Sequence, residues 1–123
     1  MSYIEPLRIE KGTDEKAYCI EPDENGIYFI EIEELERLEV AISDSNPVTA
    51  GFILVGTQLK PLPVGTTLCQ DTGKFYWTPG PGFVGKYHFV FIERDRDNYL
   101  TRKEVIVEIR PKSTIIRQEA VRE

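Results

Sequence analysis

The chain has 123 residues, a net charge of −6 and an apolar content of 41%, which are the size and balance of one folded domain. This acidity excludes the basic phosphate-binding track of a nucleic-acid-binding protein. No apolar run approaches the roughly 20 residues that span a bilayer, so we expect no membrane insertion.

Acidic residues are concentrated in the first third of the chain. Residues 1–43 contain 12 Asp and Glu against 4 Lys and Arg, whereas residues 44–123 contain 9 against 11. This asymmetry would permit weak head-to-tail self-association or docking on a basic neighbour. A solvated acidic surface is the commoner explanation.

Strand-like segments begin with a predicted hairpin, whose strands are Lys16–Ile20 and Ile27–Ile32. Asn25 and Gly26 supply the positive φ angles that a tight turn between these strands needs. The segment 30–40 is rich in helix formers, and we interpret it as strand, turn and strand with one helical turn at Glu33–Arg37. Next, apolar residues alternate with others in the pattern of a half-buried strand, at Leu38, Val40 and Ile42.

The middle of the chain contains a short apolar run at residues 51–56, which predicts a strand covered on both faces. Residues 58–68 contain Pro61 and Pro63, which lack the N–H of a sheet ladder, so an edge or a loop is expected there. The sequence KFYW at residues 74–77 is a further short strand.

Two long strands are expected near the C-terminus. Residues 86–94 place aromatic side chains on one face and aliphatic ones on the other: Tyr87, Phe89 and Phe91 against Val90 and Ile92. Residues 94–101 turn the chain, and residues 103–110 return with one apolar face, formed by Val105, Val107 and Ile109. About eight strands with turns every 8–12 residues predict an all-β, antiparallel β-sandwich.

The segment WTPGPGFVGKY at residues 77–87 contains the spacing G-x-G-x-x-G at Gly80, Gly82 and Gly85. A dinucleotide-binding loop needs a helix to begin at the last glycine, but the residues after Gly85 favour a strand. Pro81 also removes one N–H from the cradle. We therefore predict a bend between two strands and no nucleotide site.

In this interpretation Pro79 and Pro81 end ladder pairing, while Gly80 and Gly82 permit positive φ angles. Gly85 would let the backbone pass close to a large side chain. Tyr87 stands two residues before Phe89, the spacing of a tyrosine corner, in which the phenol hydroxyl bonds to an upstream main-chain group. We expect Tyr87→Phe to destabilise the fold by about 1 kcal/mol or more through loss of that hydrogen bond.

The positions Pro63, Gly65, Leu68, Thr72, Gly73, Phe75, Trp77, Thr78 and Pro79, followed by Gly85, Tyr87 and Phe89, resemble a bacterial family of immunoglobulin-like and cadherin-like modules. The resemblance covers residues 61–110, and Phe89 stands where an antibody domain has its second cysteine. It implies an immunoglobulin-like sandwich of about 7–9 strands over residues 1–111, with Phe75 and Trp77 packed between the sheets. Residues 112–123 would be a polar tail or linker, or a short helix capped by Ser113.

The resemblance also implies a function: a non-catalytic structural or adhesion module of a larger bacterial secreted or surface protein, with neighbouring modules or another protein as partners. Modules of this kind work outside the cell. The start of the chain has no signal peptide, which leaves the cytoplasm as the alternative location.

Two features of the sequence could form a site, and each has a simpler explanation. Asp95, Asp97 and Asn98 offer oxygen ligands that calcium accepts, yet Asp and Asn in a turn bond their own backbone, and we favour a plain turn. Cys19 and Cys69 are interpreted as free thiols, with a disulfide between them as the alternative.

No catalytic constellation is evident. His88 is the only histidine, so zinc lacks ligands, and we interpret it as a partly buried, hydrogen-bonded strand residue. Ser43 or Ser45 could be placed in a Ser/His/Asp triad, but no nucleophile-elbow sequence supports one. The adjacent Glu33 and Glu34 reflect the abundance of glutamate in the chain. We assign no catalytic, cofactor-binding or metal-binding residue and expect the chain not to be an enzyme.

The alternative function is a ligand-binding module that holds a glycan or a peptide through exposed aromatic side chains or an open sheet edge. Tyr76 points away from the face of Phe75 and Trp77. Together with Tyr3, Tyr18 and Tyr99 it would offer a stacking surface if these rings were exposed in one row.

Overall fold

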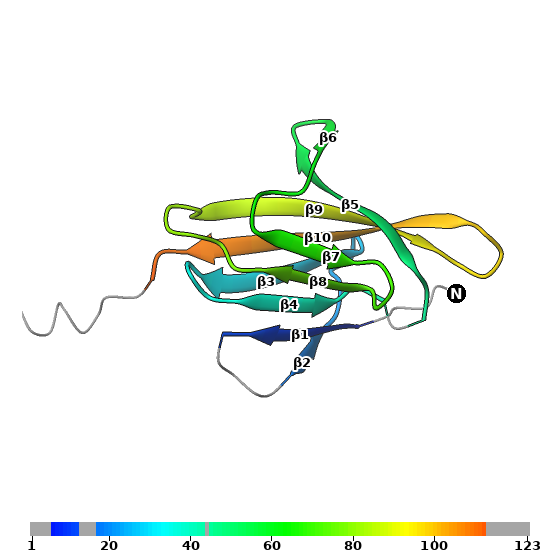
Figure 1. The fold of residues 1–123 in the computed structure, drawn as a ribbon, viewed down its shortest axis with the longest axis horizontal. Coiled ribbons are helices and arrows are strands. Elements are labelled where there is room, and N and C mark those ends of the chain that lie inside the picture. Colours follow the sequence, from blue (N-terminus) through cyan, green and yellow to red (C-terminus); the bar gives the residue numbers. More distant parts are fainter. Residues whose placement is uncertain (1–5, 13–16, 44, 113–123) are drawn as a thin grey trace, which may run out of the picture.

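The fold was analysed in a computed structural model, which describes residues 6–12, 17–43 and 45–112. These residues form ten strands and no helix, so the fold is all-β (Figure 1). Among them there is accordingly no helix that could cross a membrane. The strands are β1 (Leu7–Lys11), β2 (Tyr18–Ile20), β3 (Ile27–Glu33), β4 (Leu38–Ala41), β5 (Val48–Val55), β6 (Gln58–Lys60), β7 (Thr66–Cys69), β8 (Lys74–Trp77), β9 (Gly85–Arg94) and β10 (Leu100–Arg110).

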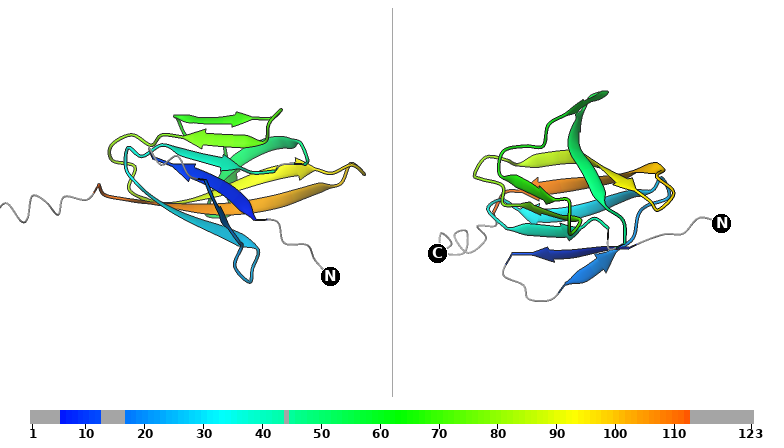
Figure 2. Two further views of the ribbon diagram at one scale, coloured as in Figure 1. Left: turned by 90° about the horizontal axis from the view of Figure 1, so that it is seen from below. Right: turned by 45° about the vertical axis from the view of Figure 1, so that its right-hand side comes forward.

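The strands form two five-stranded sheets that pack face to face as a β-sandwich (Figure 2). One sheet has the order β2-β1-β4-β8-β7, which we call sheet A, and the other has the order β3-β10-β9-β5-β6, which we call sheet B. Seven of the eight strand pairings are antiparallel, and β3 pairs with β10 in parallel. The predicted sandwich is confirmed, although it has ten strands where about 7–9 were expected.

The period-2 patterns located most strands correctly. The alternating residues Leu38, Val40 and Ile42 are buried, as are Val105, Val107 and Ile109 in β10. Residues 58–60 form an edge strand and residues 61–65 a connection, as the prolines predicted. The last strand, β10, ends at Arg110, and the division at residue 111 stays a prediction. Residues 113–123, with their proposed linker or helix, lie outside the described residues.

The predicted hairpin of residues 16–32 is wrong. A tight turn is present, because Gly26 has φ +81° and its N–H donates to the Asp23 carbonyl at 2.9 Å. However, β2 belongs to sheet A and β3 to sheet B, so the chain crosses between the layers instead of pairing with itself. Lys16, the predicted start of the first strand, lies outside the described residues.

Two smaller predictions also need correction. The segment Glu33–Arg37 contains a turn closed by the Glu36 N–H and the Glu33 carbonyl at 3.1 Å, with Leu35 at φ +70°, and no helical turn. In β5, Phe52, Ile53 and Leu54 are only half-buried. The strand is therefore not covered on both faces, because none of the described residues forms a layer on the outer side of sheet B.

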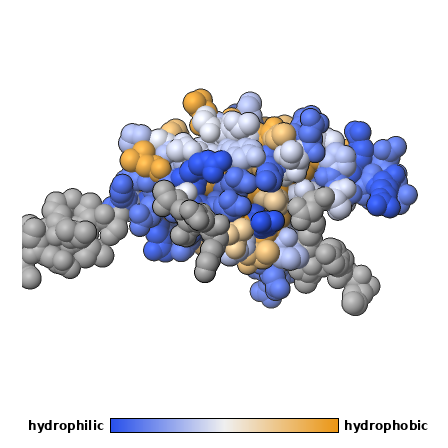
Figure 3. All heavy atoms as spheres, turned by 60° about the horizontal axis from the view of Figure 1, so that its bottom comes forward, coloured by the Kyte–Doolittle hydropathy of each residue, from blue (hydrophilic) through white to orange (hydrophobic). Residues whose placement is uncertain are grey.

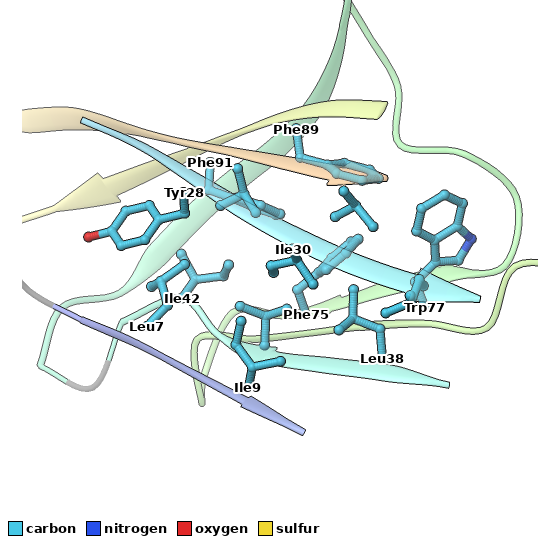
Figure 4. Close-up of a cluster of buried hydrophobic side chains, with 14 of the residues drawn as sticks. Leu7, Ile9, Tyr28, Ile30, Leu38, Ile42, Phe75, Trp77, Phe89 and Phe91 are labelled. Atoms are coloured by element: carbon cyan, nitrogen blue, oxygen red, sulfur yellow. The ribbon is translucent and has the colours of Figure 1, made fainter. Parts of the chain in front are cut away.

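Within the largely aliphatic core, a row of aromatic side chains joins β8 of sheet A to β9 of sheet B (Figure 4). Phe75 lies 5.0 Å from Phe89 and 5.1 Å from Phe91, between ring centroids. Trp77 continues the row, with its ring centroid 5.3 Å from Phe89 and 5.1 Å from Tyr87. Phe75 and Trp77 thus pack between the sheets, as predicted, and their edge-to-face geometry adds to the stabilisation from burial.

Gly73 closes the loop between β7 and β8 with φ +72°, and a Cβ added there would lie 2.5 Å from the Ser43 carbonyl oxygen. Backbone atoms cannot move aside as a flexible side chain can. We expect Gly73→Ala to lower the free energy of unfolding by about 3 kcal/mol, from strain and collision together. Gly82→Ala is the matched control, because Gly82 has φ +89° but a Cβ added there would meet none of the described residues within 4 Å. This variant should cost about 1 kcal/mol. Urea unfolding of both variants checks the difference, and equal losses would contradict the collision.

Candidate functional site

The glycine run is a bend between two strands. No helix begins at Gly85, which is the first residue of β9. The Gly82 N–H, which a phosphate loop would offer to its ligand, donates to Glu34 Oε2 at 3.2 Å. Hydrogen bonds from the Lys112 N–H, which has the larger effect, and from the Gly82 N–H hold the pKa of Glu34 below its usual value. The prediction of a structural corner is confirmed, since the protein's own carboxylate occupies the amide.

Details of that corner differ from the prediction. Gly82 has φ +89° and Gly85 φ +135°, whereas Gly80 has no positive φ. A Cβ added at Gly85 would meet none of the described residues within 4 Å, so glycine is needed there for its backbone angle and not for a close contact.

Tyr87 does not form a tyrosine corner with any of the described residues. Among the described residues no hydrogen bond involves its hydroxyl, and its ring packs at right angles on Trp77, with centroids 5.1 Å apart. The sequence spacing therefore located an aromatic contact and not a hydrogen bond.

We consequently expect Tyr87→Phe to change the free energy of unfolding by less than about 0.5 kcal/mol, because the ring contact is retained. Thermal unfolding followed by circular dichroism measures the effect. A loss above about 1 kcal/mol would contradict this account. It would show that the Tyr87 hydroxyl has a hydrogen-bond partner outside the described residues.

The loop between β9 and β10 is a turn held by Asp95. Its Oδ1 accepts the N–H groups of Asp97 and Tyr99, each at 2.9 Å, and Asn98 adopts φ +68°. These bonds confirm the predicted turn, in which Asp95 bonds its own backbone neighbours. No group of three or more potential metal-binding side chains occurs within residues 6–12, 17–43 and 45–112.

Cys19 and Cys69 are both free and lie on opposite edges of sheet A, in β2 and β7. Four strand spacings of about 4.8 Å separate them, roughly 19 Å, which no disulfide spans. The Thr72 hydroxyl and N–H lower the pKa of the half-buried Cys69 thiol.

The tyrosines do not form one row. Tyr18 lies on the edge strand β2, Tyr76 on the outer face of sheet A, and Tyr99 in the turn after β9. The Arg37 guanidinium stands over the Tyr76 ring, 5.5 Å from its centroid, and covers it. Tyr3 lies outside the described residues. The face in Figure 3 is mostly hydrophilic, with hydrophobic side chains in small separate areas.

A different surface gathers apolar side chains: the outer face of sheet B. Phe89 and Phe91 point into the core, so their neighbours in β9 point outward, and directly paired residues share this direction. The register places one transverse row of outward residues across the sheet, which is Phe29, Ile106, His88, Leu54 and Leu59. A second row contains Ile27, Glu104, Val90 and Phe52. We call these two rows the contact face.

The contact face is apolar apart from a polar cluster centred on the Glu104 carboxylate. His88 Nε2 lies 2.7 Å from Glu104 Oε1, and Arg102 Nε lies 3.2 Å from Glu104 Oε2. His88 is thus a hydrogen-bonded strand residue, as predicted. Around it, Phe29 is 45% exposed and Leu59 43% exposed, whereas Val90 is completely covered by its neighbours. An exposed aromatic and aliphatic area of this kind is typical of a protein–protein contact.

Two surface hollows elsewhere among the described residues are polar. One is lined by Arg8, Glu10, Glu39, Ala41 and Lys74 on the outer face of sheet A. Its charges neutralise one another, since Lys74 Nζ lies 3.3 Å from Glu39 Oε2, and Glu39 raises the pKa of Lys74. Another lies between loops and is lined by Ser43, Ser45, Asn46, Pro47, Gln70, Asp71 and Thr72. Ser43 Oγ accepts the Asn46 N–H at 3.0 Å, a structural role.

A buried ion pair escaped the sequence-based predictions. Glu93 and Lys103 are 6% and 9% exposed, with Lys103 Nζ 3.5 Å from Glu93 Oε1 and 2.7 Å from the Ile42 carbonyl oxygen. Both residues continue apolar inward-facing series, after Phe91 and before Val105. A charged residue at an inward-facing position of a strand is the sequence signal that could have predicted this pair.

No protein-family model matches this chain, and no curated protein matches it. The resemblance over residues 61–110 therefore remains a proposal, and the contact face has to be interpreted from its own chemistry.

Proposed function

We propose that this chain is a non-catalytic β-sandwich module that binds another folded protein through the contact face. The observation that carries the proposal is the set of apolar side chains on the outside of sheet B, where Phe29 and Leu59 remain exposed on a well-paired sheet. Exposed apolar area on a rigid sheet is available for protein contact at little conformational cost. The sequence resemblance supports the immunoglobulin-like, cadherin-like kind of module, working in a bacterial secreted or surface protein.

Site-specific photo-cross-linking tests the contact face. A photoreactive phenylalanine replaces Leu59 or Ile106, and the cells that produce the protein are irradiated. We expect both positions to give the same protein adduct, because both side chains lie on the contact face. Tyr99 is the control, since it is 69% exposed but lies in the turn after β9. No adduct from the contact face, or equal adducts from Tyr99, would overturn the proposal.

Placement outside the cell is part of the same proposal. Antibody labelling of intact cells should detect the chain without permeabilisation. Labelling that requires permeabilised cells would favour the cytoplasm.

The second candidate function is ligand binding at a sheet edge, and one observation favours peptide over glycan as the ligand. Edge strand β3 spans seven residues, whereas the other edge strands β2, β6 and β7 span three, three and four. A long edge offers main-chain hydrogen bonds to an extended peptide. The tyrosines that would stack on a sugar lie on separate elements.

A further inference from the structure

The free edge of β3 carries the N–H and C=O groups of alternate residues. Glu34 donates its N–H to Arg110 at the end of β10, at 2.9 Å, so the even-numbered residues face β10. The odd-numbered residues face away: Ile27 donates to Asp23 Oδ1 at 3.0 Å and Glu33 to Glu36 Oε1 at 2.9 Å. Both ends of the edge are thus closed by the protein's own side chains.

None of the described strands pairs with the centre of this edge. Lys11 Nζ of β1 donates to the Glu31 carbonyl at 3.0 Å. The N–H and C=O of Phe29 and the N–H of Glu31 have no hydrogen-bond partner among the described residues. These three groups can pair with one added strand.

Sheet A extends beyond sheet B at this edge. In β2, Tyr18 and Ile20 pair with Ile9 and Leu7 and so share their inward direction. Leu7 and Ile9 are fully buried, but Tyr18 is 39% exposed and Ile20 is half-buried. The described part of sheet B has no strand opposite β2, and a strand added beside β3 would take that place.

The Lys11 side chain stands in that place. Its ammonium group bonds the Glu31 carbonyl and lies 5.9 Å from the centroid of the Tyr18 ring. An added strand would displace the ammonium from Glu31 and leave it beside the new strand. Because Lys11 points inward, it would need an acidic partner there.

We propose that this place binds an extended peptide segment of another protein, which adds to sheet B antiparallel or parallel to β3. The segment has an apolar side chain that packs under Tyr18 and an acidic side chain that pairs with Lys11. This inference deepens the second candidate function and does not depend on the contact face, because it involves the backbone edge of β3.

The geometry favours a lone segment over a second copy of this chain. In each copy β1 lies over the β3 edge, as the bond between Lys11 and Glu31 requires. Pairing β3 with β3 of a second copy would therefore bring the second β1 into the space of the first β2. A single strand without its own covering layer avoids this collision.

A phage-displayed library of random twelve-residue peptides, selected on the full chain, tests the proposal. We expect enriched peptides to alternate apolar residues and to carry Asp or Glu. A synthetic enriched peptide should bind Glu31→Pro at least about tenfold more weakly than wild type, because proline removes one edge N–H and its ring obstructs the added strand. Glu31→Ala is the matched control, since it also loses the contact with Arg110 and should bind within about twofold of wild type.

Amide hydrogen exchange of the wild-type chain tests the same proposal if the Glu31→Pro variant does not fold. Peptide binding to wild type should slow exchange of the Phe29 and Glu31 amides. No enrichment, unchanged exchange at these amides, or equal affinity for a folded Glu31→Pro variant would overturn the proposal. These amides could instead become more protected as the protein concentration rises without peptide. That result would show that a second copy of the chain binds the edge, and it would also overturn the proposal. Cross-linking at Leu59, on the opposite edge strand, can succeed or fail independently.

Discussion

Replacing Trp77 with alanine should lower the free energy of unfolding by about 3–5 kcal/mol, the largest loss expected from a single core side chain. Trp77 is 1% exposed and contacts aromatic rings from the bend and from β9, at Phe83, Tyr87 and Phe89. Alanine would leave a cavity where the two sheets meet, and the rigid strands around it cannot close it. Urea unfolding followed by circular dichroism measures the loss, because Trp77 is the only tryptophan and its fluorescence disappears with it.

Trp77→Phe is the control for this prediction. The buried indole Nε1 has no hydrogen-bond partner among the described residues, so phenylalanine gives up ring area but no hydrogen bond. We expect a loss of about 1–2 kcal/mol. A loss for Trp77→Phe as large as that for Trp77→Ala would show that the indole nitrogen has a partner and that packing is not the main contribution.

Lys103→Ala should destabilise the fold by about 3–5 kcal/mol, because it leaves the buried carboxylate of Glu93 without its cation. Glu93 Oε2 already has no hydrogen-bond partner among the described residues, so Glu93 has little alternative compensation. The Ile42 carbonyl also loses its 2.7 Å donor. Thermal and urea unfolding check the result.

The double variant Lys103→Met, Glu93→Leu separates this charge effect from packing. It removes both charges and keeps similar side-chain volumes, so we expect its stability to lie within about 1 kcal/mol of wild type. A double variant as unstable as Lys103→Ala would contradict the account of an uncompensated charge.

The period-2 pattern predicted the fold well wherever one face of a strand meets the core. Phe75 and Trp77 in β8, and Val105, Val107 and Ile109 in β10, were assigned to the correct face because alternation reports burial directly. By contrast, β1 was not predicted. Its five residues include only two buried apolar positions, Leu7 and Ile9, which give a weak periodic signal.

The sequence could not predict which strands pair. The turn at Gly26 has hairpin chemistry, yet β2 and β3 separate into different sheets, because a turn defines local angles and not the layer that each strand joins. The parallel pairing of β3 with β10 joins residues far apart in the chain, such as Ile27 and Glu104. Lys11 became important only through that arrangement, since its partner Glu31 lies on the β3 edge.

The sequence likewise could not predict the long-range contact partners of a side chain. The spacing of Tyr87 and Phe89 placed both residues in β9 but could not reveal that Tyr87 packs on Trp77. The turn at Asp95 was predicted correctly, because Asp bonds to amides only two and four residues away. Local bonds follow from sequence, whereas long-range partners follow from packing.

Residue-resolved amide hydrogen exchange of the free chain tests most directly whether β3 is an open edge beside β10. We expect slow exchange at Tyr28, Ile30 and Ile32, whose N–H groups face β10, and fast exchange at Phe29 and Glu31, whose N–H groups face outward. Equal protection of all five amides would show that the edge is already occupied. Fast exchange of all five would show that β3 does not pair with β10, and either result would contradict the sheet arrangement on which peptide binding at this edge depends.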